Sequence, residues 1–219
     1  MERIFANKRK IVLNLELFDP QNAVGKYQMP FIYKDDVVPS GIIDFCRAVS
    51  SHDYLRGVHF YLDDYRFERL WNNPFRYIPI LRRFHCVFTP DFSIFHDMPL
   101  PMKIWNVYRS RLLGQIMQQA GIRVIPTVSW AEKESFDFCF DGLEPGGTIS
   151  VSSVGIGRNA KRRKLYEDGF LAMANKIAPK TIIEYGEKHI HIPIDAKYIF
   201  FPTTTFEWKK KQNDINYRA

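Results

Sequence analysis

The sequence predicts an α/β domain built from repeated strand–helix units, with a sheet whose strands run mainly parallel. Short apolar runs alternate with helical segments from about residue 30 to residue 205. Polar or turn-forming residues follow most of these runs, and 219 residues fit one domain better than two. Strands that are separated by helices pair in parallel, because a hairpin cannot join them.

Two arrangements of such units are compatible with right-handed crossovers. We prefer a compact or incomplete TIM-like barrel, because the units follow one another without an obvious switch point. The alternative is a doubly wound open sheet. Both arrangements place a ligand at the carboxyl ends of the strands, so we expect the functional residues there.

The expected elements follow from the spacing of apolar residues. Strands are expected at residues 31–33, 57–62, 86–89, 122–125, 148–152, 181–185 and 198–201, and helices at residues 42–49, 73–84, 101–120 and 160–178. Ser40 is a candidate cap for the first helix, and Asn73 for the second. Pro79 is expected to kink or break that second helix. The alternating residues 136–140 predict a short strand or a loop.

Composition sets the expected organisation and setting. We expect an N-terminal arm at residues 1–29, a single α/β domain at residues 30–205 and a basic tail at residues 206–219. No apolar run approaches the roughly 20 residues that span a bilayer, and the start lacks the apolar stretch of a signal peptide. Three widely spaced cysteines favour reduced thiols in a cytoplasmic protein. The net charge of +7 favours a polyanionic partner. The oligomeric state stays open.

Four stretches of the chain carry specific motifs. They are residues 61–74 (YLDDYRFERLWNNP), 89–93 (TPDFS), 106–111 (NVYRSR) and 126–130 (PTVSW). Together they resemble a domain-of-unknown-function family of bacteria, phages and plasmids, over roughly residues 30 to 205. The resemblance implies a mobile-element setting and implies no particular activity.

Acidic residues follow several of the expected strands. Asp64 and Asp91 come after two successive strands, and Glu184 lies near the end of a later one. Because the ends of parallel strands converge, these carboxylates could serve as general acid and base. They could also bind a divalent cation such as Mg²⁺, which prefers oxygen ligands. The alternative is local structure, with Asp64 capping a helix and Asp91 forming a turn with Ser93.

A glycine-containing turn precedes the expected helix at residues 160–178. Gly155 and Gly157 lie in this turn, and Arg158 and Lys161 follow them. Backbone amides and cations at the start of a helix can hold a phosphate group. The spacing matches neither the dinucleotide fingerprint nor the P-loop. The alternative is a mobile loop followed by a solvated basic helix face.

Two further residues are candidates for the same site. Arg109, on the helix at residues 101–120, could reach Asp64 or Asp91 or form a structural ion pair. Trp130 could stack on a base or a sugar, or pack over the strand ends. His59 lies in the middle of an expected strand and is interpreted as a core residue.

The leading hypothesis is a phage or mobile-element enzyme that acts on a nucleotide or nucleic acid through a carboxylate site at the strand ends. One alternative is a non-catalytic nucleic-acid-binding accessory protein that uses the lysine and arginine clusters at residues 8–10, 161–164 and 209–211. Another is a binder of a small phosphorylated ligand. The sequence does not identify the reaction.

Overall fold

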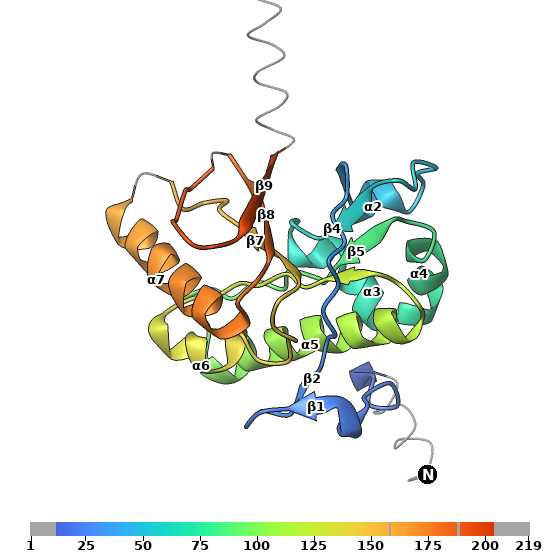
Figure 1. Ribbon diagram of the computed structural model, residues 1–219. Coiled ribbons are helices and arrows are strands. Elements are labelled where there is room, and N and C mark those ends of the chain that lie inside the picture. The colour runs from blue at the N-terminus through green and yellow to red at the C-terminus, as the bar shows by residue number, and fades with distance from the viewer. Residues whose placement is uncertain (1–11, 158, 188, 204–219) are drawn as a thin grey trace, which may run out of the picture.

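Parallel strands form the centre of the computed structural model, which describes residues 12–157, 159–187 and 189–203. A four-stranded sheet has the order β3-β4-β5-β6, and a three-stranded sheet has the order β7-β8-β9 (Figure 1). The strands are β3 (Ile42–Asp44), β4 (Gly57–His59), β5 (Cys86–Phe88), β6 (Val124–Ile125), β7 (Thr148–Ser152), β8 (Thr181–Gly186) and β9 (Lys197–Pro202). Every pairing within these two sheets is parallel.

The two sheets meet where β6 ends and β7 begins. A parallel bridge joins Thr127 to Ser150, and the Val128 amide donates to the Ser150 carbonyl at 2.8 Å. The strands therefore follow chain order across both sheets, without the reversal that a doubly wound sheet requires. Among the described residues β3 and β9 remain edge strands, so the sheet is not closed. The expected α/β class with mainly parallel strands is confirmed, whereas a closed barrel is not found.

Helices occupy most of the connections between strands. They are α2 (Phe45–Ala48), α3 (Glu68–Asn72), α4 (Pro74–Leu81), α5 (Leu100–Gln119), α6 (Phe136–Cys139) and α7 (Ala160–Ile177). Short 3-10 turns lie at η1 (Pro20–Asn22), η2 (Asp64–Arg66) and η3 (Lys133–Ser135). None of the helices in the described ranges combines the length and apolar character needed to cross a bilayer.

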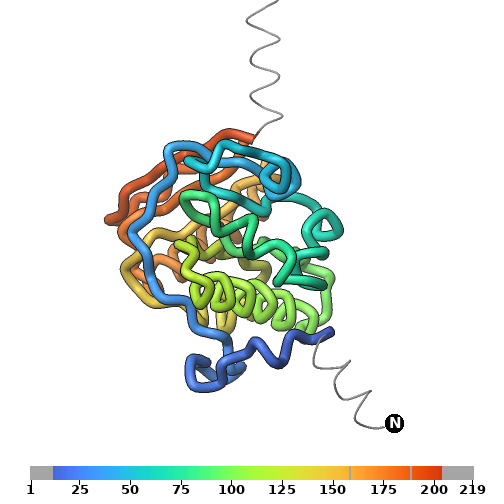
Figure 2. Tube along the Cα trace, turned by 90° about the vertical axis from the view of Figure 1, so that its right-hand side faces the viewer, coloured from blue at the N-terminus to red at the C-terminus, as the bar shows by residue number. Residues whose placement is uncertain are grey.

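A small antiparallel pair, β1 (Ala23–Val24) and β2 (Met29–Pro30), precedes the parallel strands. Figure 2 shows the segment after β2 running along one side of the molecule to the end where β3 lies. Met29 and Ile32 are buried in the main core. Residues 12–29 therefore include side chains that pack on the domain, although the sequence separated them as an arm.

The sheets are apolar on both faces. Val87 and Ile182 belong to the large core, while Cys86, Phe88 and Ile183 belong to a second, smaller cluster. Neighbouring residues on a strand point to opposite faces, so the second cluster lies on the other side of the strands. This smaller cluster takes residues from both sheets. The two sheets therefore share one inner face, which the smaller cluster fills. The large core covers their other face, as is usual for parallel sheets.

Two expected elements near the start of the domain are wrong. The strand expected at residues 31–33 is a single bridge between Ile32 and Leu143. The helix expected at residues 42–49 begins as strand β3, because Ile42 and Ile43 pair with β4. Helix α2 starts only after Asp44, whose side chain accepts from the Arg47 amide. Asp44, and not Ser40, is therefore the cap.

Two expectations concerning helices also need correction. Residues 136–140 form neither a strand nor a loop, since Phe136–Cys139 is the short helix α6. Pro79 lies inside α4, which continues through it. The predicted cap of this helix is confirmed, because the Asn73 side chain accepts from the Arg76 amide at 3.2 Å. Helices α5 and α7 lie where the apolar spacing predicted them.

Candidate functional site

The carboxyl ends of the parallel strands surround a cavity of about 710 Å³. We call it the mouth cavity. Every strand from β3 to β9, or the loop that directly follows it, contributes at least one lining residue. In chain order, the polar and aromatic ones are Asp44, His59, Tyr61, Asp63, Arg66, Asp91, Ser93, Phe95, Ser129, Ser152, Tyr185, Glu187 and Thr203. The predicted convergence of strand ends is therefore present as a single hollow.

Asp91 is the carboxylate whose surroundings change its chemistry most. It follows β5 and lines the mouth cavity. Burial raises the pKa of Asp91 to about 7, the negative charge of Asp64 adds to this rise, and a hydrogen bond from Ser129 opposes it. A carboxyl group with a pKa near neutrality can both give and take a proton under physiological conditions. Its place in a cavity makes it the best acid–base candidate among the described residues.

Three neighbouring rings, of which two are stacked and one is tilted, line the mouth cavity. Tyr61 and Tyr185 lie face to face, with ring centroids 4.8 Å apart and planes 5° apart. The ring of His59 lies 4.9 Å from that of Tyr185. Tyr61 also shares a short hydrogen bond with the Ser150 hydroxyl. These contacts join β4 to β7 and β8 across the inner face.

His59 was interpreted from the sequence as a core residue, and the structure places it in the wall of the mouth cavity as well. Its side chain is 3% exposed, and burial lowers the pKa of His59 to about 4. The ring is therefore neutral at physiological pH. Its Nδ1 atom accepts from the Tyr61 amide at 3.3 Å, which leaves the proton on Nε2. The sequence feature that could have indicated its place in the cavity wall is its position at the end of the parallel strand β4.

Asp64 holds a loop rather than lining the mouth cavity. Its carboxylate accepts from the Ser93 hydroxyl at 2.8 Å and from the Ser93 amide at 3.1 Å. The Asn106 side chain donates to the Ser93 carbonyl at 2.7 Å. Asp91 lies two residues before Ser93 in the same loop, so these bonds fix the loop that carries it. Its neighbour Asp63 contributes the lining carboxylate.

The three carboxylates predicted as ligands of one metal ion are not brought together. Glu184 is 1% exposed, and it contacts His189 Nδ1 and the Ile190 amide. Ile183 points to the inner cluster, so Glu184 points to the opposite face of β8. In the part of the chain that the structure describes, no group of three or more His, Cys, Asp or Glu side chains could hold a metal ion.

Arg109 forms the structural ion pair that was its alternative interpretation. Its guanidinium donates to Glu68 at 2.7 Å and to Asn106 at 2.7 Å. It also lies 3.8 Å from the centroid of the Phe92 ring. Asp64 interacts with Arg109 electrostatically, but the carboxylate that Arg109 hydrogen-bonds is that of Glu68, which belongs to the unpredicted helix α3.

A buried arginine on α5 holds the segment that leads into the site. Arg111 donates to the carbonyls of Thr127, Cys139 and Asp141, at 3.2, 2.7 and 3.0 Å. Burial lowers the pKa of Arg111 to about 10. The bond to Thr127 fixes the loop after β6 just before Ser129, which reaches both Asp91 and the second pocket described next.

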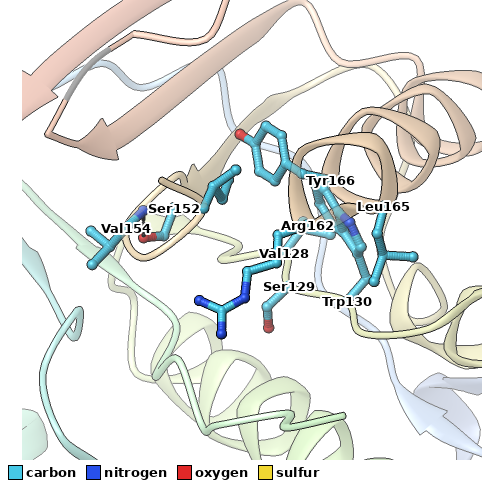
Figure 3. Close-up of a pocket in the computed structure, with 9 residues that line it drawn as sticks. Val128, Ser129, Trp130, Ser152, Val154, Arg162, Leu165 and Tyr166 are labelled. Atoms are coloured by element: carbon cyan, nitrogen blue, oxygen red, sulfur yellow. Dashed lines mark hydrogen bonds between the residues drawn. The ribbon is translucent and has the colours of Figure 1, made fainter. Parts of the chain in front are cut away.

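A second pocket of about 210 Å³ lies beside the mouth cavity, between the loops after β6 and β7 and the first turns of α7. We call it the side pocket. Its lining residues are Val128, Ser129, Trp130, Ser152, Val154, Ile156, Arg162, Leu165 and Tyr166 (Figure 3). Ser129, Ser152 and Val154 line the mouth cavity too. The two hollows are therefore adjacent and share one wall.

Helix α7 places three side chains in the side pocket by its periodicity. Arg162, Leu165 and Tyr166 are spaced three and four residues apart, which puts them on one face. The Trp130 ring stacks on Tyr166 with centroids 5.3 Å apart. Gly169 continues this face, and a Cβ there would lie 2.1 Å from Trp130 Nε1. The absence of a side chain at Gly169 therefore gives Trp130 its position.

The glycine-containing turn lies at the outer edge of the side pocket. Gly155 and Gly157 have φ angles of +78° and +55°, and a Cβ at either would meet nothing within 4 Å. The Asn159 side chain caps α7 by accepting from the Arg162 amide at 3.0 Å. Lys161 is exposed, and Arg158 lies outside the described residues. Neither glycine is among the lining residues of the two hollows.

The basic start of α7 is partly neutralised by its own acidic residues. Arg163 pairs with Glu167 at 2.9 Å, and Lys164 pairs with Asp168 at 2.7 Å. Arg162 forms no ion pair with a carboxylate of the described ranges, and its Nη1 atom donates to the Gly155 carbonyl at 3.4 Å. Figure 3 shows its guanidinium extending toward Ser129. Arg162 is thus the cation that, among the described residues, lines the side pocket.

Comparison with known proteins shows that the chain is similar to two mycobacteriophage proteins. It is 36% identical over 179 residues to the Gene 1 protein of Mycobacterium phage D29, covering 80% of this chain and 65% of that protein. It is 37% identical over 181 residues to the Gene 1 protein of Mycobacterium phage L5, covering 80% of this chain and 77% of that protein. The chain thus spans just under two thirds of the D29 protein. No solved structure matches it.

The family comparison covers the parallel strands and both hollows. The model described as a domain of unknown function, DUF4417, matches residues 21–203. This range starts before β1 and ends at Thr203, which lines the mouth cavity. The resemblance seen in the four sequence motifs is thereby confirmed, and the chain belongs to the DUF4417 family.

Proposed function

We propose that this phage-type protein is an enzyme that acts on a nucleotide or nucleic acid through a carboxylate site, with Asp91 as the general acid–base group. The observation that carries the proposal is the mouth cavity, to which all seven parallel strands contribute. Burial there raises the pKa of Asp91 to about 7. In the proposed step a proton passes between the Asp91 carboxyl and an oxygen or nitrogen of the substrate.

Other residues support Asp91 in this proposal. The Ser129 hydroxyl hydrogen-bonds to Asp91 and orients its carboxyl group. His59, neutral and protonated on Nε2, offers a hydrogen-bond donor in the lining of the same cavity. Asp64 is a positioning residue that acts through Ser93. The incomplete barrel predicted from the sequence is the arrangement that best accounts for the shared inner cluster and the chain-ordered strands.

The phosphate group of the substrate is proposed to lie beside the Arg162 guanidinium, on the rim of the side pocket near Ser129. Arg162 supplies a guanidinium that no described carboxylate neutralises, and such groups bind phosphate through paired N–H donors. Gly155, Gly157 and Lys161 flank this position, and Arg158 adjoins them in the sequence. The mouth cavity itself carries Asp44, Asp63, Asp91 and Glu187 against Arg66, so it favours the neutral part of the substrate.

A non-catalytic nucleic-acid-binding role receives less support. Two of its three basic clusters, at residues 8–10 and 209–211, lie outside the described residues. In the third, Arg163 and Lys164 already pair with acidic residues one turn away. Binding of a small phosphorylated ligand without catalysis would use the same two hollows, but it gives no role to a carboxyl group that titrates near neutrality.

The test is an activity screen on the full chain. Nucleosides, nucleotides and single-stranded oligonucleotides are incubated from pH 5 to pH 9, and the products are separated and weighed by mass spectrometry. We expect turnover with a pH profile that changes slope near pH 7. Asp91→Asn should lower kcat by about 100-fold or more, the contribution typical of a general acid–base group.

The matched control is Asp137→Asn, an exposed carboxylate on α6 outside both hollows. It should leave turnover unchanged. Two results would overturn the proposal. One is that no compound of the panel is altered at any pH, and the other is that Asp91→Asn retains the full rate.

A further inference from the structure

The side pocket has the walls of a binding site for a flat ring. We infer that it holds the heteroaromatic base of the substrate, with Trp130 and Tyr166 as its aromatic wall and Arg162 at its rim. This inference rests on the proposed function, because it assigns a place to one part of a nucleotide-class substrate. It also names the substrate as one that carries a base, rather than a sugar phosphate alone.

The shape and lining of the side pocket support a ring. Its volume is about 210 Å³, which exceeds what a single phosphate group fills. Six of its nine lining residues are apolar or aromatic: Val128, Trp130, Val154, Ile156, Leu165 and Tyr166. In Figure 3, Trp130, Leu165 and Tyr166 lie on one side of the hollow, and Ser152 and Val154 lie on the other. Stacking on such a wall tolerates any base, because every base has a π-face.

The polar residues of the side pocket are placed to hydrogen-bond with the polar edges of a base. Ser129 and Ser152 offer hydroxyl groups on the shared wall with the mouth cavity. The Arg162 guanidinium lies at the rim, where it can bind the phosphate or a carbonyl edge of the ring. Small ligand sites commonly combine mostly apolar walls with a few polar groups that fix orientation.

The adjacency of the two hollows gives the substrate one orientation. With the base in the side pocket, the sugar lies at the wall formed by Ser129 and Ser152. Asp91 reaches this wall through its hydrogen bond with Ser129. The carboxylates of the mouth cavity then face sugar hydroxyl groups, which can donate to them. The reacting bond is therefore placed at the sugar rather than deep in the base.

Binding measurements on the full chain test this assignment. The ligands are adenosine 5′-monophosphate, ribose 5-phosphate and orthophosphate, measured by calorimetry and by tryptophan fluorescence. We expect the monophosphate to bind at least about fivefold more tightly than ribose 5-phosphate, the lower end of what stacking of one base contributes. Trp130→Leu should remove this difference. Trp105→Leu, outside both hollows, should preserve it.

A second variant guards against a folding defect at Trp130. Val154 is 49% exposed and lines the side pocket, so Val154→Trp fills the hollow from the solvent side. It should weaken binding of the monophosphate to the level of ribose 5-phosphate. Equal affinity of the two ligands for the parent chain, or full affinity in Val154→Trp and in a folded Trp130→Leu protein, would overturn the inference.

The same measurements separate this inference from the proposed function. Asp91→Asn should leave the affinity for the monophosphate within about threefold, because asparagine keeps a side-chain oxygen that accepts from a sugar hydroxyl group. If the base contributes nothing but turnover still requires Asp91, the ring assignment alone is wrong. If the base contributes as expected but no turnover depends on Asp91, the catalytic proposal alone is wrong.

Discussion

At the scale of single residues, the site depends on how burial changes the charge of two groups. Burial raises the pKa of Asp91 to about 7 and lowers that of His59 to about 4. Both shifts favour the uncharged form. The mouth cavity therefore holds one group that changes its charge near neutrality beside one that stays neutral.

The raised pKa of Asp91 predicts a dependence of stability on pH. Between about pH 4 and pH 7 the folded protein keeps this proton while the unfolded chain releases it, so the free energy of unfolding falls as pH rises through this window. Asp91→Asn removes that loss. From pH 4 to pH 8, the free energy of unfolding of the variant should therefore rise by roughly 1–2 kcal/mol relative to that of the parent chain. This is less than the full pKa difference would give, because the cavity is open to water.

Urea unfolding at several pH values measures this gain. Asp137→Asn serves as the control, since its carboxylate is exposed and its curve should run parallel to that of the parent chain. If the curve of Asp91→Asn also runs parallel, the carboxyl group of Asp91 does not have a raised pKa.

The sequence predicted which residues lie at the strand ends better than it predicted where their side chains point. Asp91, Trp130 and the basic start of α7 were placed at the strand ends, where they lie. Glu184 also lies near a strand end, but the alternation of β8 turns it away from the inner face. Arg109 contacts Glu68, and this partner could not be foreseen because α3 spans only Glu68–Asn72.

At the scale of elements, helix α5 determines how closely the loops of the site approach. It has polar side chains in the interior, including Arg111, which holds the loop after β6. It also packs tightly at Gly114, where a Cβ would lie 2.4 Å from Ile32 Cδ1 and 2.8 Å from Thr89 Cγ2. The helix can approach β5 this closely only because that position has no side chain.

Gly114→Ala should therefore destabilise the protein. Overpacking of a tight contact typically costs about 1–3 kcal/mol, which outweighs the gain of about 1 kcal/mol in helix propensity. Urea unfolding measures the difference. Gly41→Ala is the control, because a Cβ there meets nothing within 4 Å, and it should change stability by less than about 0.5 kcal/mol. A Gly114→Ala protein as stable as the control would contradict the packing described.

Element prediction succeeded where the pattern was long and failed where it was short. Helices α5 and α7 show apolar residues over many turns, and their bounds were close to the prediction. Strand β3 has three residues followed directly by α2, so the run from Ile42 was interpreted as one helix. The alternation at Phe136–Cys139 imitated a strand, although the local chain forms a helix that buries Phe138 and Cys139.

At the scale of the whole molecule, chain-ordered parallel strands gather their loops at one end. This convergence was predicted from the succession of strands and helices, and both hollows result from it. The closure of the sheet could not be predicted, because it depends on whether β3 and β9 meet. In the described structure they remain edges, and a third hollow of about 580 Å³ lies between them, lined by Ile42, Phe201 and Pro202 among others.

The proposed chemistry depends on the burial of Asp91 by this convergence of strands. A titration of its side-chain carbon by ¹³C NMR, with Asp91→Asn used for assignment, measures the pKa of this group. We expect a pKa near 7, and a lower value in Asp64→Asn because that change removes a neighbouring negative charge. A pKa near 4 would show a solvated carboxylate and would contradict the enclosed site.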